Sequence, residues 1–126
     1  MKMLKRTVAM FLAGISLSLS LSAQADEWPE LLGVQQQWAV VNYSLQEEEK
    51  LKGFDALIAQ AQGLTQTWPD RAEAWIWLGI SQSSAAGAQG GLDALGLAKQ
   101  ARESFEKAMS LDETALSGSA MTSLGV

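Results

Sequence analysis

The sequence predicts an all-α protein built from antiparallel helical hairpins. Apolar residues recur at three- and four-residue spacing along most of the chain after residue 28, which is typical of one face of an α-helix. Only two prolines occur, Pro29 and Pro69, and each stands before a helical pattern. The sequences at 44–47 and 70–73 have the S/D-x-x-E form of a capping box, which marks a helix start.

Two helices are predicted before residue 70. The first begins at Pro29, because a missing N–H is tolerated in the first helical turn. The second begins near Leu45 and is broken at 68–70. Their predicted buried faces comprise Leu31, Leu32, Gln35, Trp38, Val41 and Asn42 in the first, and Leu51, Phe54, Leu57, Ile58, Ala61 and Leu64 in the second.

Three further helical patterns follow. The third helix starts after the second capping box, and a stretch of small residues at 83–91 is expected to interrupt it. Asp93 is the predicted cap of the fourth helix, which ends at Asp112 and Glu113. A fifth pattern begins at Ser117 and reaches the last residue of the sequence.

The segment 75–108 resembles the tetratricopeptide repeat. The residues that carry the resemblance follow the pattern W-x2-L-G, then A-x3-F, then a small residue: Trp75, Leu78, Gly79, Ala101, Phe105 and Ala108. The resemblance implies that residues 26–126 form helical hairpins stacked as a short solenoid, with an incomplete last repeat. It also implies that Gly79 and Ala101 let two helices approach closely while Phe105 fills the space beside them.

The sequence departs from the repeat pattern at two places. Gln82 stands where the repeat has a tyrosine, and Glu113 stands where its closing proline would be. Leu78 and Ala101 are also separated by about ten residues more than the repeat expects. This insertion includes Gly87-Ala88-Gln89-Gly90-Gly91, which we interpret as a flexible connector; the alternatives are an ordered loop that shapes a site or a phosphate loop, although the Lys-Ser/Thr of a P-loop is missing.

The segment 120–126 resembles 74–80, with a Leu-Gly pair followed by a β-branched residue in both. No second helix follows it to cover Met121 and Leu124. Three explanations are open: the sequence is part of a longer solenoid, the open half-repeat associates with itself or with another protein, or the last segment is disordered.

The first 25 residues are typical of an export signal. Lys2, Lys5 and Arg6 are followed by an uncharged, largely apolar segment at 7–21 and by Ala23-Gln24-Ala25, a small-x-small cleavage site. The alternatives are a membrane anchor, for which the segment is short and rich in serine, and an alternating strand. We therefore expect cleavage after Ala25, a periplasmic location and no stable membrane anchor in the mature chain.

Charge and composition narrow the function classes. The whole chain has nine basic and fourteen acidic residues, and without residues 1–25 six basic residues remain against fourteen acidic ones, a net charge of −8. Nucleic acid is not an expected partner, because it requires a cationic surface. Without histidine or cysteine, the chain lacks the commonest general base, the thiol nucleophile and most zinc ligands, so we expect neither an enzyme nor a metal or other cofactor.

Glu47-Glu48-Glu49 is interpreted as a solvated first helical turn, with weak calcium binding as the alternative.

The expected function is binding. By resemblance, the first helix of a repeat lines the concave surface, which gives Glu73, Ile76, Ile80 and Ser83 as a contact strip. Trp77 is either a packing residue or a ligand-facing aromatic residue, and Ile76 and Ile80 have core packing as their alternative. We expect a periplasmic adaptor or scaffold for a protein or peptide partner, with a solute-binding accessory protein of a transport system as the alternative.

Overall fold

The computed structural model describes residues 28–125, and this part of the chain is all α-helical. Its five helices are α2 (Pro29–Ser44), α3 (Glu47–Thr67), α4 (Ala72–Gln89), α5 (Gly91–Leu111) and α6 (Ala115–Leu124). No strand occurs between residues 28 and 125. The all-α prediction is confirmed for these residues, whereas the predicted signal segment 1–25 lies outside them.

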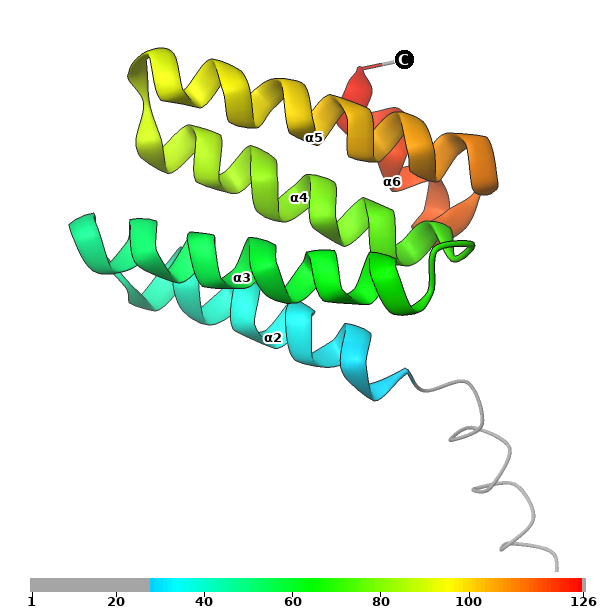
Figure 1. The fold of residues 1–126 in the computed structure, drawn as a ribbon, viewed down its shortest axis with the longest axis horizontal. Coiled ribbons are helices and arrows are strands. Elements are labelled where there is room, and N and C mark those ends of the chain that lie inside the picture. Colours follow the sequence, from blue (N-terminus) through cyan, green and yellow to red (C-terminus); the bar gives the residue numbers. More distant parts are fainter. Residues whose placement is uncertain (1–27, 126) are drawn as a thin grey trace, which may run out of the picture.

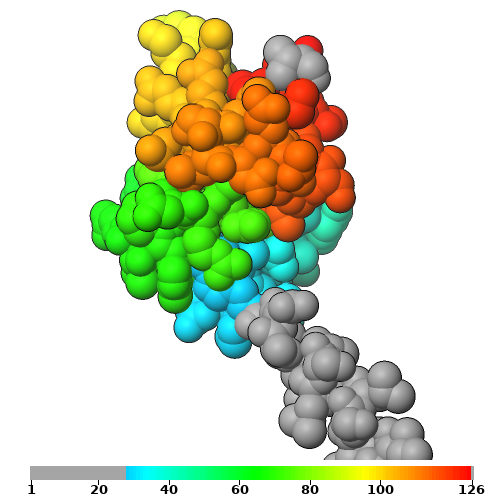
Figure 2. Space-filling model, turned by 90° about the vertical axis from the view of Figure 1, so that its right-hand side faces the viewer, coloured from blue at the N-terminus to red at the C-terminus, as the bar shows by residue number. Residues whose placement is uncertain are grey.

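Consecutive helices pack against one another. Figure 1 shows α2 to α5 as neighbours whose chain direction reverses at each connection, and contacts join each helix to the next. α4 also contacts α2 and α6, whereas α3 and α5 do not contact each other. Seen end on, α5 and α6 lie above the green end of the α3–α4 pair, and the start of α2 lies below it (Figure 2). α4 is therefore the central helix of the described residues.

The helices start close to the predicted positions, but the predicted caps are wrong. The residues at the N-cap positions of α3 and α4 are Gln46 and Arg71, and neither side chain makes a capping hydrogen bond. Ser44 is the last residue of α2, so it belongs to the preceding helix instead. Asp93 is likewise inside α5, because Gly90 is the residue before that helix.

The predicted flexible connector at 87–91 is almost entirely helical. α4 continues through Ser83 and Gly87 to Gln89, and α5 begins at Gly91, so Gly90 alone separates the two helices. Gly90 and Gly91 have φ angles of 67° and 66°, values that glycine adopts without a steric penalty. The insertion therefore lengthens both helices of the hairpin, which contact each other.

The last helix differs from its prediction at its start. α6 begins at Ala115, but Leu116, Ser117 and Gly118 have left-handed φ angles of 48°, 59° and 75°, so regular helix starts only beyond them. Before this turn, the hydroxyl and the N–H of Thr114 donate to Oδ1 of Asp112 at 2.8 and 2.9 Å. These hydrogen bonds hold the pKa of Asp112 below its ordinary value.

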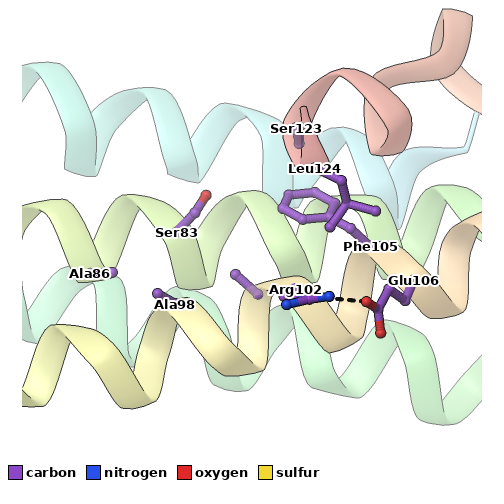
Figure 3. A pocket seen from close by; sticks show the side chains of 9 residues that line it. Ser83, Ala86, Ala98, Arg102, Phe105, Glu106, Ser123 and Leu124 are labelled. Atoms are coloured by element: carbon purple, nitrogen blue, oxygen red, sulfur yellow. Dashed lines mark hydrogen bonds and ion pairs between the residues drawn. The ribbon is translucent and has the colours of Figure 1, made fainter. Parts of the chain in front are cut away.

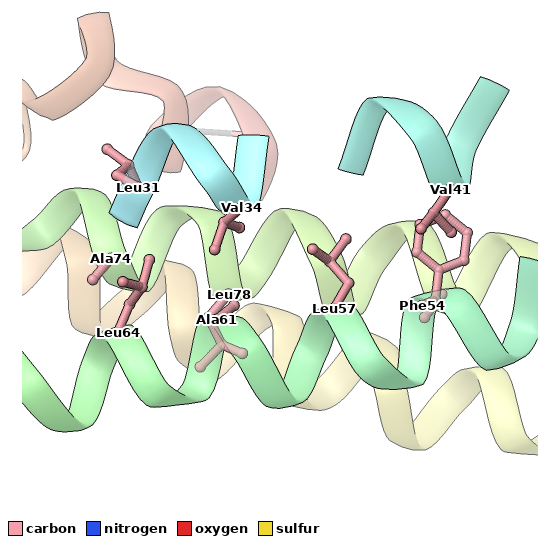
Figure 4. Close-up of a cluster of buried hydrophobic side chains, with 10 residues drawn as sticks. Leu31, Val34, Val41, Phe54, Leu57, Ala61, Leu64, Ala74 and Leu78 are labelled. Carbon is pink, nitrogen blue, oxygen red and sulfur yellow. The ribbon is translucent and has the colours of Figure 1, made fainter. Parts of the chain in front are cut away.

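Two clusters of buried side chains form the core, and α4 contributes to both. The first joins α2, α3 and α4, and Figure 4 shows side chains of α2 and α3 directed toward each other within it. Its members are Leu31, Val34, Val41, Phe54, Leu57, Ala61, Leu64, Ala74, Leu78 and Ala85. The second joins α4, α5 and α6, and its members are Ala72, Ile76, Ala101, Phe105, Ala108, Ala115 and Ala120.

The predicted buried face of α2 is wrong in part. Val34 is completely buried, whereas Leu32 exposes 46% of its surface. The buried residues Leu31, Val34 and Val41 have the three- and seven-residue spacing of a narrow stripe. Leu32 lies about 100° away from Leu31 around the helix, which turns it out of the core.

The helices α4 and α5 approach closely where Gly79 faces Phe105. A Cβ placed on Gly79 would lie 2.7 Å from Cε1 of Phe105, a distance shorter than normal van der Waals contact. Phe105 is 3% exposed, Ala101 is 3% exposed and Ala108 is completely buried. Trp75 packs against both core clusters, and its Nε1 donates to the carbonyl oxygen of Pro69 at 2.9 Å.

Gln82, which replaces the tyrosine of the repeat pattern, has a specific partner in α5. Both Gln82 and Ser104 are buried, and the Ser104 hydroxyl donates to Oε1 of Gln82 at 2.6 Å. A buried polar group is tolerated when it is hydrogen-bonded. The pair therefore joins α4 and α5 one turn beyond the contact between Gly79 and Phe105.

Replacing Gly79 with alanine should destabilise the protein. The new methyl group would overlap the Phe105 ring, and overpacking of this kind costs about 1–3 kcal/mol. Gly87→Ala in the same helix is the matched control, because a Cβ there meets no atom within 4 Å. Removing a helical glycine stabilises by roughly 0.5–1 kcal/mol, so Gly87→Ala should unfold at equal or higher urea concentration than the parent. Equal urea midpoints for Gly79→Ala and the parent would contradict the packing described here.

Candidate functional site

The four residues expected to form a contact strip, and Trp77 beside them, do not lie on one surface. Ile76 is completely buried in the second core cluster together with Ala115 and Ala120 of α6, so it has no surface with which to contact a partner. Ile80 is half-buried against the same cluster. For Ile76 the structure shows the core-packing alternative, because α6 covers this side of α4.

Trp77 packs against the first core cluster. Its ring lies edge-on to that of Trp38, with 6.0 Å between the ring centroids. Nε1 of Trp38 in turn donates to the hydroxyl oxygen of Ser84 in α4, at 2.9 Å. These contacts place Trp77 among the residues that join α2 to α4, which is the packing alternative stated for it.

Glu73 and Ser83 remain at the surface but line two different grooves. Ser83 lies at a groove of about 560 Å³ between α4, α5 and α6. Figure 3 shows Phe105 and Leu124 next to each other there, and Arg102 paired with Glu106 at 2.9 Å. The other lining residues are small: Ala86, Ala98, Ala101 and Ser123. This groove presents few large apolar side chains to a ligand, since Phe105 is itself a buried packing residue.

Glu73 lies at a second open groove of about 430 Å³, which we call the α2/α6 groove. It is formed by the first turns of α2, the start of α4 and the left-handed turn of α6. Its lining residues are Trp28, Leu31, Leu32, Gln35, Arg71, Glu73 and Leu116. Leu32 and Leu116 expose 46% and 38% of their surface, so both aliphatic side chains are available to a partner.

One wall of the α2/α6 groove is a connected row of aromatic and charged side chains. The Trp28 ring lies edge-on to Trp68, with 5.1 Å between ring centroids. Cζ of Arg71 lies 3.8 Å from the centroid of the Trp28 ring, and Nε of Arg71 lies 3.7 Å from Oε2 of Glu73. Arg71 is therefore held between an indole face and a carboxylate, which fixes a cation at the edge of an apolar groove.

The chemistry of this groove is that of recognition. It offers two exposed leucines, an indole face, the side-chain amide of Gln35 and a paired arginine and glutamate. Between residues 28 and 125, no three or more of His, Cys, Asp and Glu come together where they could hold a metal ion. None of the helices in that same range is long and apolar enough to cross a membrane.

Most lining residues of the α2/α6 groove were not recognised in the sequence as site residues. Leu32 was assigned to the buried face of its helix, and Leu116 precedes the predicted start of the last helix. Trp28 and Arg71 each directly precede a helix, and such positions are where chain ends and connections meet. The sequence feature that could have indicated this groove is therefore the presence of Trp28 and Arg71 directly before two helices, α2 and α4.

Comparison of the chain with protein-family models, with curated proteins and with solved structures finds no match.

Arg71→Ala should change the environment of Trp28 with little effect on stability. Exposed cation–π contacts contribute about 0.5–1 kcal/mol, and exposed ion pairs a similar amount or less. The Trp28 indole N–H resonance should shift in a proton–nitrogen correlation spectrum. Lys107→Ala is the matched control, because it removes the other cation–π contact, 5.9 Å above Trp75. That variant should shift the resonance of Trp75 and leave Trp28 in place; an unmoved Trp28 signal in Arg71→Ala would rule out the contact.

Proposed function

We propose that this chain is an exported tetratricopeptide-like scaffold that binds a protein or peptide partner of the cell envelope. The observation that carries the proposal is the α2/α6 groove, where exposed aliphatic side chains lie beside an ordered tryptophan–arginine pair. Partner sites on proteins commonly combine apolar anchors with aromatic residues and arginine. Such a groove suits a polypeptide segment with one or two aliphatic side chains.

The helix contacts support the repeat-like part of the proposal. α2 and α4 are the first helices of two successive hairpins, α6 follows the second hairpin, and α4 contacts both α2 and α6. α3 and α5, the second helices, pack only on helices next to them in the chain. In a tetratricopeptide solenoid the first helices line the concave side, and the α2/α6 groove is formed by helices of this set. Two residues of the repeat pattern also meet, where Phe105 covers Gly79, and Ala101 and Ala108 share the second core cluster with Phe105.

A polypeptide partner is favoured over a small solute by the form of the groove. Sites for small molecules are enclosed and bury most of the ligand surface. The α2/α6 groove is open, and two of its three leucines, Leu32 and Leu116, remain more than one-third exposed. An extended or helical segment could cover these side chains, whereas a small solute would leave most of its own surface in water.

Site-specific photo-crosslinking tests the binding proposal. A photoreactive amino acid at Gln35 or at Leu116, introduced in cells that make the protein, should form a covalent adduct with the same polypeptide. The control position is Glu103, an exposed residue of α5 far from the groove lining. Leu116→Asp should weaken the adduct formed from Gln35, because a desolvated charge opposes apolar contact. Equal adducts from all three positions, or none from the two groove positions, would reject this groove as the binding site.

The mass of the intact protein from a periplasmic extract tests export. Cleavage after Ala25 should give a chain that begins at Asp26. The proposal of a cleaved signal is wrong if the mass includes residues 1–25. This result would leave the groove experiment unaffected, because all lining residues of the groove follow residue 27.

A further inference from the structure

The first turn of α6 has a backbone conformation that is rare for residues with side chains. Leu116, Ser117 and Gly118 have φ angles of 48°, 59° and 75° and ψ angles of 46°, 35° and 27°, which together make a left-handed turn. Left-handed residues normally occur singly and are usually glycine, because a Cβ then lies too close to the following carbonyl oxygen. Leu116 and Ser117 are each disfavoured in this conformation by a factor of roughly 5–30. Such strain persists only where the surrounding structure holds it.

The burial of two alanines holds this turn in place. Ala115 and Ala120 stand on either side of it, and both belong to the second core cluster, at 6% and 1% exposure. In an uninterrupted right-handed helix, residues five positions apart lie about 140° apart around the axis, so one of the two alanines would leave the core. The left-handed turn removes this difference. Packing on α4 and α5 therefore opposes the strain of the backbone.

The same turn places Leu116 in the wall of the α2/α6 groove, where it is 38% exposed. Two hydrogen bonds lie within the turn itself: the N–H of Gly118 donates to the carbonyl oxygen of Thr114 at 3.3 Å, and the hydroxyl of Ser119 donates to the carbonyl oxygen of Leu116. A change of φ at Leu116 to the right-handed region would rotate its side chain away from its present position. The wall of the groove therefore depends on the handedness of this turn.

From these observations we infer that residues 116–118 are a conformational switch for the α2/α6 groove. The left-handed turn places Leu116 in the groove wall, and a right-handed turn withdraws it. A partner that contacts Leu116 binds the left-handed form more tightly and shifts the turn toward that form. Because such coupling is reciprocal, a change that disfavours the left-handed turn weakens binding. The effect on binding rests on the proposed function, whereas the two forms of the turn do not.

Two glycine substitutions in α6 test the switch. Gly118→Ala adds a Cβ at a φ of 75°, and the nearest atom that this Cβ meets is the carbonyl oxygen of Glu113, at an ordinary contact distance of 3.8 Å. The substitution adds backbone strain without a steric clash, so it should shift the ratio of left- to right-handed turn roughly 5–30-fold toward the right-handed form. Gly125→Ala is the matched control, because it adds a Cβ at a φ of 79° in open space at the other end of α6.

NMR measures the handedness of the turn. A positive φ brings the amide and Hα protons of one residue close together, so Leu116 should give a strong intraresidue Overhauser effect in the parent and in Gly125→Ala. This signal should weaken in Gly118→Ala. Ser117→Gly should keep the signal and unfold at a higher urea concentration than the parent, because glycine has no steric penalty at a φ of 59°. A weak Leu116 signal in the parent, or an unchanged one in Gly118→Ala, would overturn the inference.

Photo-crosslinking from Gln35 measures the coupling to binding. The adduct should decrease in Gly118→Ala and persist in Gly125→Ala. It should recover when Ser117→Gly is added to Gly118→Ala, because glycine at position 117 relieves the added strain. A turn that becomes right-handed without a change in adduct yield, or an equal loss of adduct in Gly118→Ala and Gly125→Ala, would refute the switch. If the parent forms no adduct from Gln35, the proposed function fails, and the NMR comparison still decides whether the turn has two forms.

Discussion

The contact between Gly79 and Phe105 sets how closely α4 and α5 approach, and the rest of the structure follows from that spacing. Because no side chain stands at position 79, the aromatic ring lies directly against the backbone of α4. Ala101 and Ala108 allow the same closeness one turn to either side of Phe105. Tight packing of this kind brings dispersion contacts that a looser helix pair would lack. It also brings Gln82 within hydrogen-bond distance of Ser104.

The central place of α4 explains which of its residues remain for binding. Its two sides are covered by different neighbours, with Ala74 and Leu78 in the first cluster and Ile76 in the second. Little of the helix surface is left over except at its ends. Its beginning, with Arg71 and Glu73, borders the α2/α6 groove, and its later turns border the groove that contains Ser83. A binding surface of this fold is therefore assembled from helix ends and turns more than from the middle of a helix.

The sequence was sufficient for the helical class and for the order and approximate limits of the helices, because these follow from the spacing of apolar residues. The sequence was insufficient where the burial of a residue depends on a neighbour that is distant in the chain. Ile76 is buried because α6 covers it, and no pattern within residues 72–89 carries that information. Ser83 and Gly87 are helical, although small residues and glycine have lower helix propensity, so the composition of this stretch did not predict its structure. The caps were misplaced by one to three residues, which decides whether a side chain can reach a backbone N–H.

The α4–α5 hairpin also has two ends of different character. Near Phe105 it is held by buried aromatic and alanine side chains, whereas Gly87, Gly90, Gly91 and Gly96 have no atom near their missing Cβ. At the far end Leu92 is 85% exposed and Leu95 is 62% exposed, so their side chains add little to holding the helices together. Regions with few buried contacts open locally at a lower free energy than the whole protein unfolds. The protection of backbone amides against hydrogen exchange should therefore decrease from Gly79 toward Gly90. The two helices would separate first at the Gly90 end, while the contact between Gly79 and Phe105 stays closed.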